Sequence, residues 1–452
     1  MQNDVDIIIG GGGVAGTAAA AALHQLGYRV VLVEPGQQDK LRLAGELFHP
    51  PGVTGLAELG LLPALLDAPL KRIKGFLVSS AADDGRSIRL PYDEVGAHAT
   101  SGIGLEHSVI RHQLMQAVEA MGITVLHGTR VIAIDQDDPS CVAVTVANGS
   151  ASATRQYRCR LVIAADGAQS RMARSVGIAI HQRRISTLFG YRIAGGDLPN
   201  FDYGQVILGA PAPVLVYPIS STEARVLFDV PHASGRLPQA ADCVEIGSVL
   251  PAWLRPAAHQ AIAEQAQMSV FASAVTIDRL VEDRVVLVGD AAGACHPLTA
   301  SGMTRCIDDA LLLRDAIAES PGDIKRALHD YQRRRRWPQA TRLTLADALR
   351  DAFCGATAET RVLRRGIVSY CRASARGRAK TMALLSTAEG RPLVLLREVL
   401  MVAIRGYLGH LRAPQPPDEG RPKAYRLMKG LFALVTAHVK QILQNAAPVQ
   451  RL

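Results

Sequence analysis

The chain has 452 residues, 48% of them hydrophobic and 20% charged, which excludes an intrinsically disordered protein and predicts two or three domains. Its seven cysteines include no CxxC pair, so we expect neither a disulfide framework nor a metal site. The net charge of +9 indicates an acidic partner, and it does not distinguish among nucleic acid, an anionic lipid and a phosphorylated cofactor. An aromatic content of 4% argues against a stacking platform for single-stranded nucleic acid.

The first predicted element is a β-branched strand, Val5–Ile9, which leads into a glycine-rich turn. An alanine-rich helix follows as far as Leu26, and a second strand, Arg29–Val33, ends at Glu34. The apolar stretch near the N-terminus lacks the basic flank of a signal peptide, and no other segment has the uncharged length of a spanning helix. These features predict a cytoplasmic protein that opens with a β-α-β nucleotide-binding unit.

The spacing of the glycines predicts how this unit holds a dinucleotide. Gly11 permits a tight turn, Gly13 lets a pyrophosphate approach the backbone, and Gly16 lets the helix pack closely on the strand. The N-terminus of the helix then faces the phosphate charge. Glu34 follows Gly16 at the distance expected of an acid that accepts hydrogen bonds from the adenosine ribose.

Two later strands end in acidic turns that favour FAD over NAD. Leu161–Ala165 runs into Asp166-Gly167, and Arg284–Val288 runs into Gly289-Asp290. A proline- and glycine-containing turn and a helix follow the second acid, with Pro297, Gly302 and Met303. A carboxylate there can accept a hydrogen bond from a ribityl hydroxyl of the flavin. Backbone amides at the start of the helix would face the flavin ring.

The middle of the chain predicts a sheet, and the region after it predicts helices. Residues 176–275 contain alternating apolar runs typical of antiparallel strands, which we expect to cover the substrate face of the flavin. Leu311–Ile317 and Leu328–Tyr331 are predicted helices. The run Arg333–Arg336 is interpreted as a solvated helix face rather than a DNA-binding element.

The last hundred residues carry many basic residues ahead of two apolar stretches, Met382–Leu385 and Leu393–Ile404. A basic flank beside an amphipathic helix is typical of a protein on an anionic membrane surface. A helical cap packed on the flavin domain is the alternative, and the pattern leaves both open.

Together these motifs resemble the squalene monooxygenase (squalene epoxidase) family within the FAD-dependent aromatic-hydroxylase class. The segment Arg42 to Pro50 resembles the family's Arg-x-x-Gly-Glu-Leu-Leu-Gln-Pro, with His49 at the glutamine position. Gly289-Asp290-Ala291, followed by His296-Pro297-Leu298-Thr299, resembles its Gly-Asp-Ala…His-Pro-Leu-Thr. Pro35 follows Glu34 where the family has arginine, so a cation near the adenosine must come from elsewhere.

The resemblance implies an α/β fold of the GR2 (para-hydroxybenzoate-hydroxylase) type. The expected Rossmann-like FAD-binding domain is discontinuous, with residues 1–75, 101–175 and 276–345. The expected antiparallel-sheet substrate domain has residues 76–100 and 176–275. Residues 346–452 are expected to form a C-terminal helical region, either associated with a membrane surface or packed as a cap on the flavin domain.

The resemblance also implies residue roles. Tyr92 and His49 are expected to orient the flavin and the substrate as the catalytic pair. The expected non-covalent FAD site comprises Gly11, Gly13, Val14, Ala15, Gly16, Glu34, Arg42, Arg111, Val131, Asp166, Asp290, Pro297, Gly302 and Met303.

The implied activity is a monooxygenase that moves one oxygen atom of O₂, through a flavin C4a-hydroperoxide, to a small lipophilic substrate. The reaction is epoxidation of an alkene or polyprene, or hydroxylation of an alkylated aromatic. NAD(P)H supplies the electrons, directly or through a separate reductase. A geranylgeranyl-type prenyl reductase is the alternative function. A flavin-dependent halogenase is disfavoured because only Trp253 and Trp337 are available for its tryptophan motif, and a non-enzymatic flavoprotein is disfavoured by Tyr92.

Overall fold

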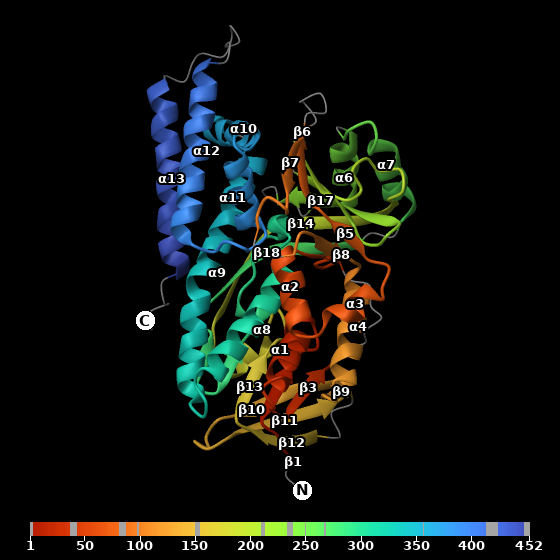
Figure 1. Cartoon of the computed structure of the whole chain (residues 1–452), viewed down its shortest axis with the longest axis vertical. Coiled ribbons are helices and arrows are strands. Elements are labelled where there is room, and N and C mark those ends of the chain that lie inside the picture. Colours follow the sequence, from red (N-terminus) through yellow and green to blue (C-terminus); the bar gives the residue numbers. More distant parts are fainter. Residues whose placement is uncertain are drawn as a thin grey trace.

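The computed structural model describes residues 3–36, 43–80, 87–96, 99–149, 154–208, 213–232, 238–248, 250–265, 268–355, 357–412 and 424–446. The chain begins at one end of the long axis of the molecule, beside strand β1, Asn3–Asp4 (Figure 1).

A six-stranded, largely parallel sheet forms the centre of the nucleotide-binding unit. Ile7, Ile8 and Ile9 are buried in its middle strand, which pairs in parallel with a neighbour on each side. Such β-branched runs suit a strand that is covered on both faces. In spatial order the strands are β19 (Val281–Glu282), β20 (Val285–Leu287), β13 (Leu161–Ala164), β2 (Ile7–Gly10), β3 (Val30–Glu34) and β9 (Thr124–His127).

Helix α1, Val14–His24, packs against this sheet and against two further helices, α4 (His107–Ala120) and α8 (Gly302–Ala318). Its small alanine side chains are fully buried and permit this close approach. A second, four-stranded sheet contacts the parallel sheet through β10 and β3. Its strands are β1, β12 (Thr154–Cys159), β11 (Val142–Asn148) and β10 (Thr129–Asp135).

The sheet predicted to be antiparallel has seven strands and is the largest in the described part of the chain. Its pairs are antiparallel except that of β6 (Gly75–Ser80) with β15 (Gly204–Leu208), which is parallel. It includes the segment 75–91 as well as strands from 180–277, because β6 pairs with β15 across more than 120 residues of sequence. The order is β18 (Met268–Ile277), β14 (Ile180–Ala194), β17 (Glu223–Pro231), β16 (Val214–Pro218), β15 (Gly204–Leu208), β6 (Gly75–Ser80) and β7 (Ile88–Pro91).

Short elements connect the sheets. A three-stranded sheet holds the segment after Gly45 in place and consists of β4 (Leu47–Phe48), β8 (Gly102–Gly104) and β5 (Lys71–Ile73). The remaining short helices are α2 (Pro50–Glu58), α3 (Leu62–Leu66), α5 (Arg171–Ser175), α6 (Ala240–Ser248), α7 (Arg255–Glu264), and the 3₁₀ turns η1 (Gly289–Ala292) and η2 (Pro297–Thr299).

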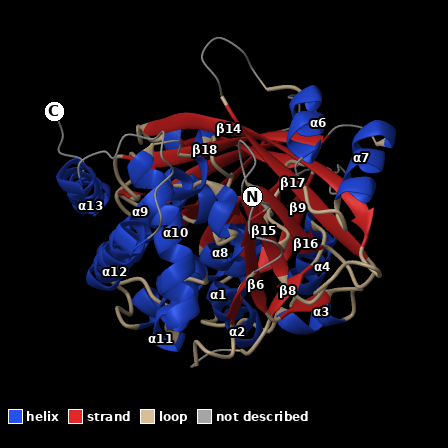
Figure 2. Cartoon of the chain, turned by 90° about the horizontal axis from the view of Figure 1, so that it is seen from above, coloured by secondary structure: helices blue, strands red, loops and turns tan. Residues whose placement is uncertain are grey.

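The C-terminal part of the chain is helical, as expected. Figure 2 shows these helices gathered beside the large sheet, and α12 and α13 run along one another on the flank of the molecule (Figure 1). The helices are α9 (Ile324–Cys354), α10 (Ala358–Ala373), α11 (Ala375–Leu385), α12 (Pro392–Arg412) and α13 (Ala424–Ala446). In the part of the chain that the structure describes, none of the helices is long and apolar enough to cross a membrane.

The arginine run in α9 is not simply a solvated face, and this expectation was wrong for Arg335. Its side chain is 2% exposed, and its Nε lies 2.8 Å from Oδ1 of Asp309. It also donates to the carbonyl of Ala292. Four consecutive helical residues point in nearly all directions around the axis, so one of them faces the core.

Candidate functional site

The glycine-rich turn has the geometry that the sequence predicts. Gly11 has a φ of +109°, and a Cβ on Gly16 would lie 1.8 Å from the carbonyl oxygen of Gly11. These two positions therefore require glycine for the protein's own packing. A Cβ on Gly13, in contrast, would meet no protein atom within 4 Å. The space in front of Gly13, at the N-terminus of α1, is therefore open to a ligand.

Glu34 lies at the end of β3 and is buried beside this turn. Its Oε2 accepts a hydrogen bond from the Gly12 amide at 2.5 Å, and its Oε1 accepts one from the Gly36 amide at 2.7 Å. Arg111 of α4 donates to Oε1 at 3.3 Å, and both side chains are largely buried. Arg111 thus supplies the cation that Pro35 does not.

Asp166 lies at the end of β13, next to the turn. Its Oδ2 accepts hydrogen bonds from the amides of Arg171 and Met172 at 2.8 and 3.1 Å. Its Oδ1 is buried and has no partner among the described residues. A buried carboxylate oxygen without a partner fits a ligand that donates a hydrogen bond there. Val131 of β10 lies close by, 3.4 Å from where a Cβ on Gly10 would be.

The second acidic turn lies over the N-terminus of α1. A Cβ on Gly289 would be 2.5 Å from that of Ala15, so the turn packs directly on the helix, beside Val14. The next residue, Asp290, lines a cavity. Burial within the protein raises the pKa of its carboxyl group. Gly302 also lines that cavity, and a Cβ there would meet no protein atom.

The cavity has a volume of about 330 Å³ and joins two kinds of lining. On one side lie the polar turn residues, including Asp290, and the segment from Pro297 to Gly302. The other side is apolar and comes from the large sheet and the segment after residue 42: Leu43, Leu47, Phe76, Leu188, Leu215, Leu227, Val270 and Phe271. Met303 lies beneath this segment, because a Cβ on Gly45 would be 2.9 Å from its Cγ.

His49 and Tyr92 form a hydrogen-bonded pair, as the resemblance implies, but behind the cavity wall. Nδ1 of His49 lies 2.7 Å from the Tyr92 hydroxyl, and Nε2 lies 2.9 Å from the carbonyl oxygen of Thr299. Because a carbonyl only accepts, Nε2 carries the proton and Tyr92 donates to Nδ1. Both side chains are almost fully buried. Phe76, which packs edge-on against Tyr92, and Thr299 separate them from the cavity.

Burial lowers the pKa of His49 from 6.5 to about 4, and the hydrogen bond to Thr299 opposes this effect. The unfolded chain therefore binds more protons than the folded protein between these two pH values. We expect the folded protein to lose about 3 kcal/mol of stability through this group as the pH falls from about 7 to 4. Urea unfolding of wild type and His49→Gln at several pH values measures the loss, which the variant should largely lack. Equal pH dependence in both proteins would contradict it.

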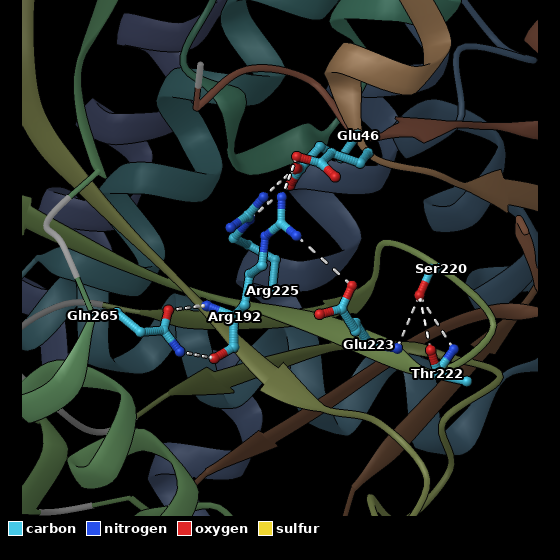
Figure 3. A network of polar contacts seen from close by, with 8 residues as sticks. Glu46, Arg192, Ser220, Thr222, Glu223, Arg225 and Gln265 are labelled. Carbon is cyan, nitrogen blue, oxygen red and sulfur yellow. Dashed lines mark hydrogen bonds and ion pairs between the residues drawn. The ribbon is translucent and has the colours of Figure 1, made fainter. Parts of the chain in front are cut away.

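Glu46, which lines the cavity, forms a buried ion pair that no local sequence pattern indicates. Nη2 of Arg225 lies 2.5 Å from Oε1 of Glu46, and the two side chains are 1% and 0% exposed. Tyr217 also donates to Glu46, at 3.1 Å. Figure 3 shows the pair beside a second cation, Arg192, whose guanidinium pairs with Glu106 and Glu223. The main chain of Arg192 exchanges hydrogen bonds with the side chain of Gln265. Burial raises the pKa of Glu46, while Arg225 opposes the shift.

The residues present fit FAD. The open space at Gly13, the unpartnered Oδ1 of Asp166 and the open space at Gly302 each leave room for a ligand. Asp290, Pro297 and Gly302 line the cavity, and Arg42 lies outside the described residues. Arg342 also lines the cavity, although no motif in the sequence indicates a role for it.

Solved structures share this architecture. Pseudomonas aeruginosa PqsL in complex with 2-aminobenzoylacetate has a TM-score of 0.64 and 21% identity, covering 83% of this chain and 98% of that one. A Cytophaga hutchinsonii flavoprotein/dehydrogenase has a TM-score of 0.73 and 15% identity, covering 90% and 100%. A family model for glucose inhibited division protein A matches residues 6–188. The fold is that of the para-hydroxybenzoate-hydroxylase class of flavoproteins, as expected.

Sequence relatives narrow the class to one family. The family model for squalene epoxidase matches residues 158–416, more than half of the chain. Squalene epoxidase 3 of Arabidopsis thaliana is 28% identical, covering 97% of this chain and 84% of its own, and squalene epoxidase of Schizosaccharomyces pombe is 30% identical, covering 73% and 72%. The chain belongs to the squalene epoxidase family. It is an FAD-dependent monooxygenase, and NAD(P)H is the source of its electrons.

Proposed function

We propose that the enzyme epoxidises an alkene in an extended, apolar polyprene. The observation that carries this proposal is the cavity itself, in which an apolar lobe opens directly onto the flavin-side turns. Hydrocarbon chains gain free energy by leaving water for such a surface. The relatives' names, squalene epoxidase, point to the same kind of substrate.

We propose that the protein's residues bind and position rather than react covalently. Bound FAD, once reduced, activates O₂, and the surrounding protein excludes water from the reaction. Gly13, Glu34 and Asp166 hold the nucleotide half, and Asp290 and Gly302 hold the flavin half. His49 and Tyr92 act as positioning residues because they hold the Thr299 carbonyl and the Phe76 ring that line the cavity.

Arg111 and Val131 complete the proposed nucleotide half. We propose that Val14 and Ala15 support it at the start of α1, where Ala15 packs on Gly289, and that Met303 supports the flavin half beneath Gly45. The division into FAD-binding residues 1–75, 101–175 and 276–345, substrate residues 76–100 and 176–275, and helical residues 346–452 stays a proposal. The membership of β6 and β7 in the large sheet supports it.

The test uses the purified holoenzyme, reduced anaerobically and then mixed with ¹⁸O₂ and a panel of polyprenes and alkylated aromatics. Mass spectrometry should find one ¹⁸O atom in an epoxide of a polyprene. A labelled phenol would replace the substrate class by an aromatic. A saturated product formed without O₂ would instead identify a prenyl reductase.

We propose that α12 and α13 bind an anionic membrane surface. Large apolar side chains are exposed on both helices: Leu393, Leu400, Ile404, Leu408 and Leu411, and Tyr425, Met428, Phe432 and Leu443. Glu398 is the one acidic residue of the two helices, and it is buried. The exposed charges are basic, for example Arg405 and Lys429. Exposed apolar residues beside basic ones are typical of helices that lie in a lipid interface.

The most exposed members of this surface are Leu393 and Phe432, which are 80% and 72% exposed. We expect the double variant Leu393→Asp/Phe432→Asp to reduce partitioning onto anionic vesicles at least tenfold, since each substitution removes roughly 1.5–3 kcal/mol of apolar burial. Vesicle co-sedimentation measures the effect. Leu66→Asp, at an exposed leucine of α3, is the control. Equal losses in both proteins would mean that these helices do not bind the membrane.

A further inference from the structure

Beneath the flavin-side turns lies a buried cluster of three arginines. Arg305, Arg335 and Arg342 are 5%, 2% and 6% exposed. The first two share one carboxylate, because Nη2 of Arg305 and Nε of Arg335 lie 2.7 and 2.8 Å from Oδ1 of Asp309. Although burial alone would raise it, these arginines hold the pKa of Asp309 below its ordinary value. Asp309 is therefore an anion shared by two cations.

Arg342 has no such partner. Its Nη2 donates to Oε1 of Gln339 at 2.8 Å, a neutral acceptor, and approaches the Gly293 carbonyl at 3.5 Å. Its buried Nε has no hydrogen-bond partner. Within the described ranges no carboxylate forms an ion pair with it. Burying a guanidinium without a directly bound anion is costly, and the unpartnered Nε leaves a donor free for a further acceptor.

Two further carboxylates, Asp290 and Asp308, act on Arg342 through their charges, but neither forms an ion pair with it in the described ranges. Burial raises the pKa of Asp290, which lines the same cavity, and raises that of Asp308 to about 6. The charge of Arg342 opposes the shift at Asp290, so these two groups interact electrostatically. Of the three arginines, Arg342 is the one that lines the cavity.

The surroundings of Arg342 indicate which kind of anion fits. The lining of the same cavity includes Asp290, the acid of the second turn, and Ala168, which follows the first turn, Asp166-Gly167. Gly289 packs on Ala15 at the N-terminus of α1, where the helix dipole and free amides favour phosphate. We propose that Arg342 binds a phosphate oxygen of a dinucleotide that enters this cavity. The dinucleotide is either FAD itself or the NAD(P)H that reduces it, and the site does not depend on which substrate is oxidised.

The first arm of the test measures FAD. The Kd follows from flavin release on dilution of the holoenzyme, and riboflavin, which has no phosphate, is measured by its exchange against bound FAD. If the phosphate belongs to FAD, Arg342→Gln should weaken FAD at least tenfold and leave riboflavin unchanged, because a charge-assisted hydrogen bond is lost. Arg342→Lys keeps the charge and should stay closer to wild type.

The second arm measures NAD(P)H. If the phosphate belongs to the reductant, FAD affinity stays unchanged in Arg342→Gln, while the concentration of NAD(P)H that half-saturates anaerobic flavin reduction rises at least tenfold. Arg350→Gln is the control, since Arg350 lies on the same helix, pairs with Asp347 and Asp351, and does not line the cavity.

Two results would overturn the proposal. One is that neither dinucleotide is weakened in Arg342→Gln; the other is that FAD and riboflavin are weakened alike, which would mean a structural role. If the variants do not fold, chemical modification of the wild-type protein still tests the proposal. Modification of Arg342 by phenylglyoxal, followed by mass spectrometry, should be suppressed by FAD or by NAD(P)H and not by riboflavin. Equal labelling in all conditions would likewise exclude a phosphate contact.

Discussion

Replacement of Arg225 by methionine is expected to lower the free energy of unfolding by about 3–5 kcal/mol, the typical result of leaving one member of a buried ion pair without its partner. Arg225 binds Glu46 through Nε at 3.0 Å and Nη2 at 2.5 Å (Figure 3), and both side chains are buried. Methionine nearly preserves the length of the side chain but leaves the Glu46 carboxylate buried without its cation. Urea unfolding, followed by circular dichroism, measures the loss.

A double-variant cycle separates the ion pair from simple packing. The variant Glu46→Leu/Arg225→Met removes both charges and should recover much of the stability, because no uncompensated charge remains. The control is Lys74→Met, which breaks an exposed pair with Asp202 at 2.7 Å and should cost less than about 1 kcal/mol. If Arg225→Met were no more destabilising than Lys74→Met, the pair would contribute little to the fold.

The ion pair also shows what the sequence could not reveal. In the sequence, Glu46 belongs to the segment that resembles a family motif, and Arg225 belongs to a run of alternating apolar residues. They are 179 positions apart, and only the packing of the large sheet against the segment after residue 42 brings them together. Arg111 and Glu34 meet in the same way across 77 positions. No local pattern encodes such a contact.

The features that the sequence did predict are local. The turn from β2 to α1 and the acid at the end of β3 lie within about 30 residues, and each position is constrained by backbone geometry or by the pyrophosphate that it must admit. Strand ends differ from the predicted ones by about a residue, as hydrogen-bond criteria allow. The antiparallel sheet was expected from alternation, yet its inclusion of β6 and β7 followed from the resemblance.

The expected roles of His49 and Tyr92 needed the structure for a different reason. The resemblance predicts them as a pair that orients the flavin and the substrate, and the two side chains do meet, at 2.7 Å. Both side chains are buried, and the residues that they contact, Phe76 and Thr299, line the cavity. A motif states which residues occur together, and it does not state which of them reaches the cavity.

Replacement of Gly13 by alanine is expected to weaken FAD at least tenfold while the fold stays intact. The reason is the contrast between neighbouring glycines: a Cβ on Gly13 meets no protein atom within 4 Å, so the methyl group would occupy the space through which the pyrophosphate approaches. The φ of −76° at Gly13 is also accessible to alanine. The Kd follows from flavin release on dilution, and the melting temperature of the flavin-free protein reports the fold.

Two matched variants serve as controls for this result. Gly196→Ala, at another position with open space around the Cβ, should leave both FAD affinity and melting temperature unchanged. Gly16→Ala should lower the melting temperature of the flavin-free protein, because its methyl group collides with the Gly11 carbonyl at 1.8 Å. If Gly13→Ala bound FAD within threefold of wild type, the pyrophosphate would not approach the chain at Gly13. The roles proposed for Glu34 and Asp166 on either side of this turn would then have to be assigned again.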